Sequence, residues 1–132
     1  MTVIDDCREW IEAALEYSGG FYEFEDIKSE IIAGNMQLWP APHGCLVTQI
    51  LDFPRKRVLH VFLGGGKLEQ LAEMHSDVIA WAQAHGCDCA TIAGRAGWER
   101  AFRDIGWTPI HRTLILDFGS WVASSAESKA QP

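Results

Sequence analysis

A glycine-rich junction between a strand-like run and a long amphipathic helix constrains this chain more than any other feature. Residues 58–63 are apolar apart from His60, and residues 64–66 are three consecutive glycines. Residues 67–85 repeat apolar side chains at helical spacing up to Gly86. Residues 87–93 form a second strand-like run. An antiparallel hairpin cannot carry a helix between its arms, so the helix must cross over the sheet and leave the two strands parallel.

The segments before this unit predict two helices followed by an antiparallel meander. Residues 3–17 and 24–33 carry apolar side chains at three- and four-residue steps, which is the period of an amphipathic helix. Residues 36–39 and 45–51 change to a period of two and are separated by a turn-forming Pro-Ala-Pro-His-Gly run. These runs and residues 58–63 are joined by connections short enough for adjacent antiparallel strands.

The remaining residues complete the expected fold. Residues 97–105 predict a short helix, and residues 108–118 predict a final strand or pair of strands. We therefore expect an α+β fold with a single mixed β-sheet, in which the antiparallel meander is joined by a parallel strand and helices flank the sheet. Residues 1–123 are expected to form a single domain, and the polar residues 124–132 a flexible tail.

Charge is unevenly distributed along the chain. Residues 1–30 hold nine of the 18 acidic residues but only two of the 11 basic ones. This argues against duplex nucleic acid as a partner and suits a basic protein surface or a second copy of the chain, although a solvated helix face explains the same charges. No apolar run is long enough to span a membrane, and Asp5 and Asp6 stand where a signal peptide would become apolar. We expect a cytoplasmic protein with reduced cysteines.

The glycine run and the lysine after it form the best candidate ligand site. Its residues are Gly64, Gly65, Gly66 and Lys67. Glycine lets backbone N–H groups approach a phosphate closely, and a helix N-terminus adds partial positive charge. Leu68 in place of Ser or Thr excludes a Walker A loop, and Glu69 excludes the G-x-G-x-x-G pattern. A plain turn between the strand and its crossover helix is the alternative interpretation.

Two other groups of residues are weaker candidates. His85, Cys87 and Cys89 stand at alternate positions, but no further Cys or His pair follows at zinc-site spacing, so no metal is expected. Buried thiols explain these cysteines equally well. The basic run at residues 55–57 lies on a predicted hairpin turn, where it can bind a phosphate or simply keep the turn soluble.

The whole arrangement resembles the GCN5-related N-acetyltransferases. The glycine run matches the G-x-G/A portion of the family's R/Q-x-x-G-x-G/A loop, and Gly106-Trp107 matches the Gly-Phe that ends its F-Y-E-K-x-G-F segment. The resemblance implies that the glycine run and Lys67 bind the pyrophosphate of acetyl-CoA, which is the expected cofactor.

Two positions depart from the family pattern. Val61 stands where the family has Arg or Gln, and Phe102 stands where it has the Tyr that often protonates the departing thiolate. Acyl transfer also needs a base for the attacking amine. His60 is the candidate, because it lies on the strand that leads into the glycines and histidine titrates near neutrality; His111 is the second choice. A histidine without any chemical role is the alternative for both.

Two functions therefore stay open. The first is a divergent acetyl-CoA-dependent N-acyltransferase, with catalysis weakened by Val61 and Phe102. The second is a non-catalytic structural or interaction protein, because the chain also resembles short acetyltransferase-like proteins encoded among phage and prophage structural genes. The run from Gly94 to Arg100 is the local likeness to these. In that case the protein is expected in a virion.

Overall fold

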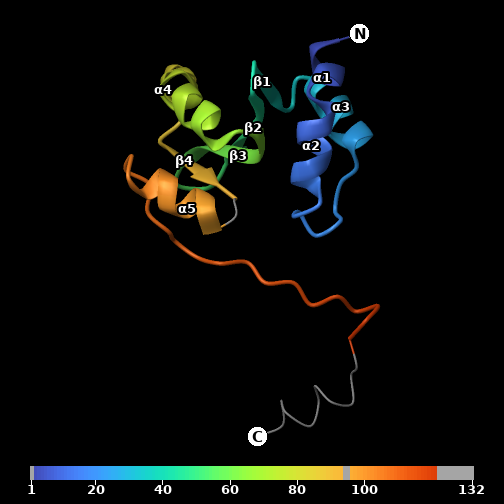
Figure 1. The fold of residues 1–132 in the computed structure, drawn as a ribbon. Coiled ribbons are helices and arrows are strands. Elements are labelled where there is room, and N and C mark those ends of the chain that lie inside the picture. The colour runs from blue at the N-terminus through green and yellow to red at the C-terminus, as the bar shows by residue number, and fades with distance from the viewer. Residues whose placement is uncertain (1, 94–95, 122–132) are drawn as a thin grey trace, which may run out of the picture.

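One sheet lies between two groups of helices (Figure 1). The computed structural model describes residues 2–93 and 96–121, so Gly94, Arg95 and the predicted tail at residues 124–132 lie outside the described residues. The elements in chain order are α1 (Val3–Asp6), α2 (Arg8–Leu15), α3 (Phe24–Ile32), β1 (Gln37–Ala41), β2 (Gly44–Asp52), β3 (Arg57–Gly66), α4 (Leu68–Ala84), β4 (Cys89–Ile92) and α5 (Ala96–Arg103).

The four described strands lie in the order β1-β2-β3-β4. β1 pairs antiparallel with β2, β2 antiparallel with β3, and β3 parallel with β4. The predicted α+β fold with a single mixed sheet is therefore confirmed. α4 crosses from the end of β3 to the start of β4. The chain turns at Gly86 after the helix, and the φ of +79° at this glycine is the left-handed conformation that commonly ends a helix.

Each face of the sheet carries its own hydrophobic core. Ile11 of α2 and Ile27 of α3 pack on one face, and Leu71 of α4 packs on the other. Neighbouring residues of β2 point to opposite cores: Val47 to the first and Leu46 to the second. Burying a large aliphatic side chain contributes about 1.5–3 kcal/mol, so these contacts hold the helices to the sheet.

A β-bulge interrupts β3 at Phe62. Val61 pairs with Thr48 and Leu63 pairs with Val47, so Phe62 has no partner on β2. Phe62 and Leu63 consequently both pack in the core beneath α2 and α3, whereas regular alternation would send them to opposite faces. The faces of β3 are therefore exchanged beyond the bulge.

The bulge also marks the place where β3 and β4 part. Their last paired residues are Val61 and Ile92. Beyond this pair, β3 continues beside β2 alone as far as Gly66. Residues 62–66 therefore have no strand of the described chain on the side where β4 lay.

Three predictions about element limits are wrong. β3 does not end at residue 63 but runs through Gly66, which pairs with Gly44, so the glycine run belongs to the strand. The predicted helix at residues 3–17 is divided at Cys7 into α1 and α2. Residues 108–118 pair with no described strand, and their side chains are exposed. Their backbone leads away from α5 (Figure 1).

Candidate functional site

The glycine run begins inside the protein. Gly64 and Gly65 are buried, and the bulge at Phe62 turns Gly64 towards α5 and Gly65 towards α2. The ring of Trp98 occupies the place that a Cβ on Gly64 would take, and a Cβ on Gly65 would lie 2.5 Å from the carbonyl oxygen of Trp10. These two glycines therefore let an aromatic side chain and a helix backbone approach the sheet from opposite faces.

The run ends at the surface, where α4 starts. Gly66 has a φ of +100°, and the amide of Lys67 donates to the carbonyl of His43 at 2.8 Å. No described side chain caps the helix, so the amides of its first turn point out of the helix end beside the exposed Lys67 side chain. Glu69 in the same turn opposes an anion there. The helix dipole and Lys67 thus favour an anion at the predicted site, and the negative charge of Glu69 disfavours it.

His60 lies two residues before the bulge. Its Nδ1 is 2.8 Å from Oγ1 of Thr91 on β4, and Gln49 is its neighbour on β2. Burial lowers the pKa of His60 below its ordinary value, because a poorly solvated imidazolium is unfavourable. The imidazole is therefore neutral at pH 7, and with Nδ1 bonded to Thr91 its Nε2 is the nitrogen left for a substrate.

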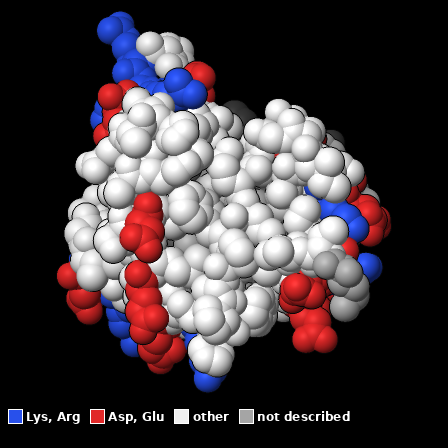
Figure 2. Space-filling view, turned by 90° about the horizontal axis from the view of Figure 1, so that it is seen from above, with Lys and Arg blue, Asp and Glu red and all other residues white. Residues whose placement is uncertain are grey.

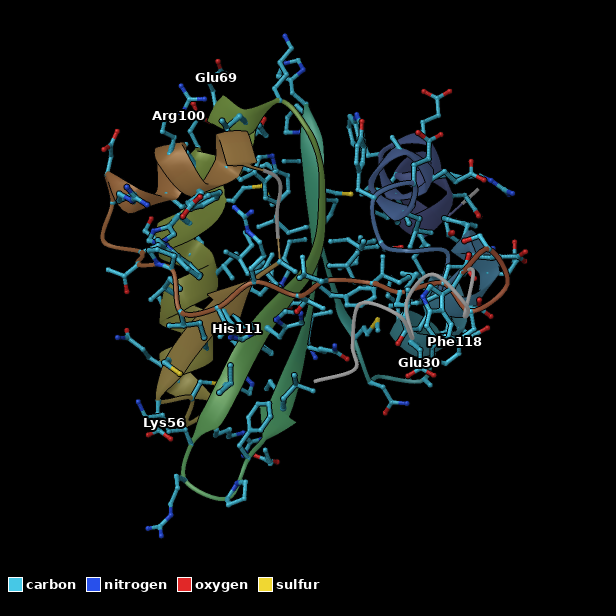
Figure 3. The ribbon with its side chains drawn as sticks, turned by 90° about the horizontal axis from the view of Figure 1, so that it is seen from below. Glu30, Lys56, Glu69, Arg100, His111 and Phe118 are labelled. Carbon is cyan, nitrogen blue, oxygen red and sulfur yellow. The ribbon has the colours of Figure 1, made fainter. Side chains whose placement is uncertain are left out.

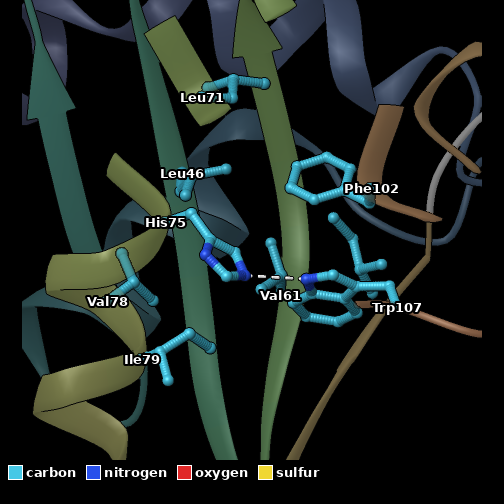
Figure 4. Close-up of a pocket in the computed structure, with 9 residues that line it drawn as sticks. Leu46, Val61, Leu71, His75, Val78, Ile79, Phe102 and Trp107 are labelled. Atoms are coloured by element: carbon cyan, nitrogen blue, oxygen red, sulfur yellow. Dashed lines mark hydrogen bonds between the residues drawn. The ribbon is translucent and has the colours of Figure 1, made fainter. Parts of the chain in front are cut away.

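The two positions that depart from the family pattern are core residues. Val61 is 4% exposed and Phe102 is 5% exposed. Phe102 packs against Trp98, and with His75 and Trp107 it lines an apolar cavity of about 20 Å³ (Figure 4). Nε1 of Trp107 donates to Nε2 of His75 at 2.8 Å across this cavity. Neither Val61 nor Phe102 presents a polar group to a ligand.

An open hollow of about 570 Å³ on the side of the sheet that carries α3 was missed by sequence reasoning. Its lining residues are Phe21, Tyr22, Asp26, Ser29, Glu30, Met36 and Gln49. Gln49 pairs with His60 across the sheet, and Tyr22 packs edge-on against Phe62 with ring centroids 5.0 Å apart. The candidate base is therefore the strand neighbour of one lining residue without lining the hollow itself, and the lining contains two carboxylates. Six of its seven lining residues lie in residues 21–36, but they carry no recognisable motif, and only the packing of this stretch beside Gln49 forms the hollow.

The weaker metal candidate does not assemble. Nδ1 of His85 lies 2.8 Å from the carbonyl oxygen of Trp81, and the two rings stack with centroids 4.0 Å apart. Cys89 is exposed and Cys87 half-buried. Within the part of the chain that the structure describes, no group of three or more His, Cys, Asp and Glu residues is arranged to hold a metal ion.

The basic run at residues 55–57 lies far from the glycine run. It forms a protruding tip of the β2–β3 turn (Figure 2), and Lys56 and Glu69 mark opposite ends of the sheet (Figure 3). Arg57 pairs with Asp52 at 3.6 Å.

His111, the second candidate base, is exposed on the extended segment after α5. No described helix is long and apolar enough to cross a membrane.

Comparisons with known proteins identify the fold. No family model matches the chain, and no curated protein matches it. A probable acetyltransferase of known structure superposes with a TM-score of 0.65 at 9% identity, covering 87% of this chain and 91% of its own. An acetyltransferase of Trypanosoma brucei matches with a TM-score of 0.56 at 14% identity, covering 84% and 94%. Glucosamine-6-phosphate N-acetyltransferase of Arabidopsis thaliana matches with a TM-score of 0.56 at 12% identity, covering 89% and 95%. This chain has the acetyltransferase fold.

The fold implied by the resemblance to GCN5-related N-acetyltransferases is thereby confirmed, in a divergent form. Within this acetyltransferase fold, residues 64–67 make one path along β3 from the interior to the surface, and His60 precedes it on the same strand. Phe102 does not contact this path directly: it packs against Trp98, and Trp98 packs against Gly64. His111 lies on a segment that pairs with no described strand.

Proposed function

We propose that this chain binds an acyl-CoA, with acetyl-CoA as the first candidate, and transfers the acyl group to an amine. The observation that carries the proposal is the parting of β3 and β4 at the bulge, directly beyond Val61 and Ile92. The unpaired backbone of β3 begins beside His60 and leads to the uncapped start of α4. An elongated ligand with an anionic end suits a path that begins at a base and ends at a helix N-terminus.

The start of α4 is the proposed place for the pyrophosphate. Backbone amides of the first helical turn supply hydrogen-bond donors, and Lys67 supplies a full positive charge. Val61 contributes nothing to this interaction, because its side chain is buried in the core. Lys67 therefore takes over the role that the family gives to Arg or Gln.

The other end of the path is the proposed place of reaction. Acyl-CoA supplies an activated thioester. The nitrogen of the amine bonds to the acyl carbon, and the carbon–sulfur bond of the thioester breaks. His60 accepts the proton that the amine loses in this step. The unpaired backbone at Phe62 can donate to the acyl oxygen, where negative charge develops. Phe102 has no proton to give, so the departing thiolate takes its proton from solvent.

A second candidate function is a non-catalytic binding protein with the same fold, such as a structural component of a virion. The packing of Trp98 on Gly64 and the burial of Phe102 favour it, because both put core contacts where a working site needs polar groups. The acidic residues of α1, α2 and α3 are then the contact surface for a basic protein partner or a second copy of the chain.

A thermal shift with acetyl-CoA tests the binding step. Ligand at 100 times its Kd stabilises a protein by about 2.7 kcal/mol, which is about 10 °C for a chain of this length. We expect Lys67→Glu to lose this shift. Lys56→Glu makes the same charge change at the opposite end of the sheet and is expected to keep it. No shift in the unaltered chain, or equal losses in both variants, contradicts the proposed site.

Acetylation of a panel of amines tests the chemical step. His60→Gln is expected to keep the acetyl-CoA shift and to lower the rate by about 100-fold or more, as loss of a general base does. An unchanged rate refutes the role of His60. Binding of acetyl-CoA without acetylation of any amine favours the second candidate function.

A further inference from the structure

Two surface features take no part in the proposed reaction and are complementary to each other. The first is the open hollow of about 570 Å³ on the α3 side of the sheet. Its volume is typical of binding sites, which range over roughly 300–1,000 Å³. Two aromatic rings, a methionine and two carboxylates line it. The hollow therefore suits a group that is apolar in one part and positively charged in another.

The carboxylates of the hollow have no cationic partner among the described residues. Asp26 accepts the backbone N–H of Glu23 at 2.8 Å, and Glu30 forms no ion pair within the described chain. Lys28 lies between them in sequence but binds Asp5 at 3.0 Å instead. Glu30 also lies in the last turn of α3, where the helix dipole disfavours a negative charge and no basic residue compensates. A cation that enters the hollow would offset this unfavourable charge.

The second feature is the hairpin tip, residues 53–56 between β2 and β3. Phe53 is 55% exposed, and Arg55 and Lys56 are exposed beside it. Neither Arg55 nor Lys56 forms an ion pair with a described residue. The hairpin tip protrudes from the molecule (Figure 2). It therefore presents an aromatic ring and two positive charges on a convex surface.

A chain cannot place its hairpin tip in its own hollow. β2 stays paired with β3 from Gln49, which lines the hollow, to Asp52 at the base of the hairpin tip. Phe53 is four residues beyond Gln49, which is about 13 Å along an extended strand. Lys56 and Glu30 are accordingly well separated in Figure 3. Any contact between the hairpin tip and the hollow must join two molecules.

The charge distribution favours a second copy of this chain as the partner. Residues 1–30 hold nine acidic and two basic residues, whereas the rest of the chain holds nine of each. The potential around the hollow is therefore negative, and it attracts a basic surface. Residues 55–57 are the longest basic run in the chain. The acidic hollow and a basic, aromatic group to fill it are thus both present in one sequence.

We propose that the hairpin tip of one copy docks in the hollow of a second copy, and that the exchange is reciprocal about a two-fold axis. Arg55 lies against Glu30 of the other copy, because a guanidinium matches the geometry of a carboxylate. Phe53 packs with the aromatic rings of the hollow, Phe21 and Tyr22. Two-fold dimers are by far the commonest symmetric oligomers of soluble proteins.

The dimer narrows the second candidate function, on whose acidic contact surface it rests, to one hollow and one partner. It is also compatible with acyl transfer, because neither the hairpin tip nor the hollow includes His60 or residues 64–67. The proposed acyl-CoA path and the proposed dimer contact are therefore separate surfaces.

Sedimentation equilibrium of the full chain, without acyl-CoA, tests the contact. We expect a concentration-dependent equilibrium between monomer and dimer. Arg55→Glu is expected to raise the Kd of the dimer by roughly 100-fold, because like charges then face each other in the hollow. Arg100→Glu is the matched control: it makes the same charge change at an exposed position of α5 and is expected to leave the Kd unchanged. Circular dichroism checks that each variant is folded.

Glu30→Lys tests the other side of the contact and is also expected to raise the Kd. Its control is Glu16→Lys, which makes the same change at the end of α2, outside the hollow. Asp26 is left unaltered, because its carboxylate caps α3. Arg55→Glu and Glu30→Lys in one chain place opposite charges together again. This double variant is therefore expected to dimerise more tightly than either single variant.

Four results overturn the proposal. A chain that stays monomeric up to about 1 mM leaves the hollow to a different basic partner. Equal effects of a variant and its control assign the dimer to another surface. Losses that add in the double variant show that Arg55 and Glu30 do not meet, and assemblies larger than a dimer contradict the reciprocal exchange. None of these measurements contains acyl-CoA, so failure here is distinct from failure of acyl-CoA binding or acyl transfer.

Discussion

Gly65 is the point where the backbone of α2 approaches β3 most tightly, and replacing it with alanine tests that packing. The new Cβ would lie 2.5 Å from the carbonyl oxygen of Trp10, 2.8 Å from its Cβ and 2.9 Å from its carbonyl carbon. Real Cβ contacts essentially never fall below 3.0 Å. Because two of these atoms belong to the helix backbone, no side-chain rotation relieves the clash, and α2 must move away from the sheet.

The magnitude follows from what α2 buries. Overpacking costs about 1–3 kcal/mol by itself, and a shifted helix also loses part of the burial of Ile11 and Leu15, worth about 1–2 kcal/mol more. We expect Gly65→Ala to lower the free energy of unfolding by about 3 kcal/mol. In a chain of 132 residues, this lowers Tm by about 11 °C.

Thermal unfolding followed by circular dichroism measures the effect, and Gly34→Ala is the matched control. Gly34 has a φ of +84° and open space around its missing side chain. Alanine there incurs only the cost of a left-handed backbone, about 1–2 kcal/mol. A loss at Gly65 no larger than the loss at Gly34 would refute the packing argument.

Burial and charge determine three other measurable properties. A thiol reagent is expected to label Cys89 in the folded protein but Cys45 only after denaturation, because burial raises the pKa of Cys45 and shields it. The His60 ring is expected to titrate below 6.5 in NMR spectra, because burial disfavours its charged form. The hydrogen bond from Lys28 lowers the pKa of Asp5 from 3.8 to about 2, so its stabilisation is present above pH 3.8 and lost as pH falls towards 2. Asp5→Asn is therefore expected to lower Tm more at pH 7 than near pH 2.

Each of these predictions has a contrary result. Rapid labelling of Cys45 in the folded protein contradicts its burial. A midpoint at or above 6.5 for His60 contradicts the effect of desolvation. Equal losses of Tm for Asp5→Asn at the two pH values mean that the ion pair with Lys28 does not stabilise the fold.

Local periodicity was sufficient to predict most elements of the fold. The helical spacing of residues 67–85 and the glycine after it correspond to α4 and to the left-handed turn at Gly86. The period of two in residues 45–51 and 58–63 corresponds to β2 and β3. These patterns reflect contacts with the core that repeat every few residues, so they are visible in the sequence.

The bulge at Phe62 was not predictable, and it changes the site most. Leu59, Val61 and Leu63 alternate as in a regular strand, yet Leu63 faces the opposite core from the other two. Only the pairing with β2 decides which residue of β3 remains without a partner. The parting of β3 from β4, on which the proposed function rests, therefore depends on a neighbouring strand and leaves no mark in the local sequence.

By itself, the sequence determined the order of the elements and the parallel pairing of β3 with β4, because a helix between two strands of one sheet permits no other short connection. It also marked the glycine run as special. Tertiary structure alone decided what the glycines do. The backbone of Trp10 packs closely against Gly65, and the ring of Trp98 packs against Gly64. Lys67, at the end of the run, is exposed to solvent. Trp10 and Trp98 are distant along the chain. Their contacts arise only when the helices pack on the sheet, and no local pattern records them.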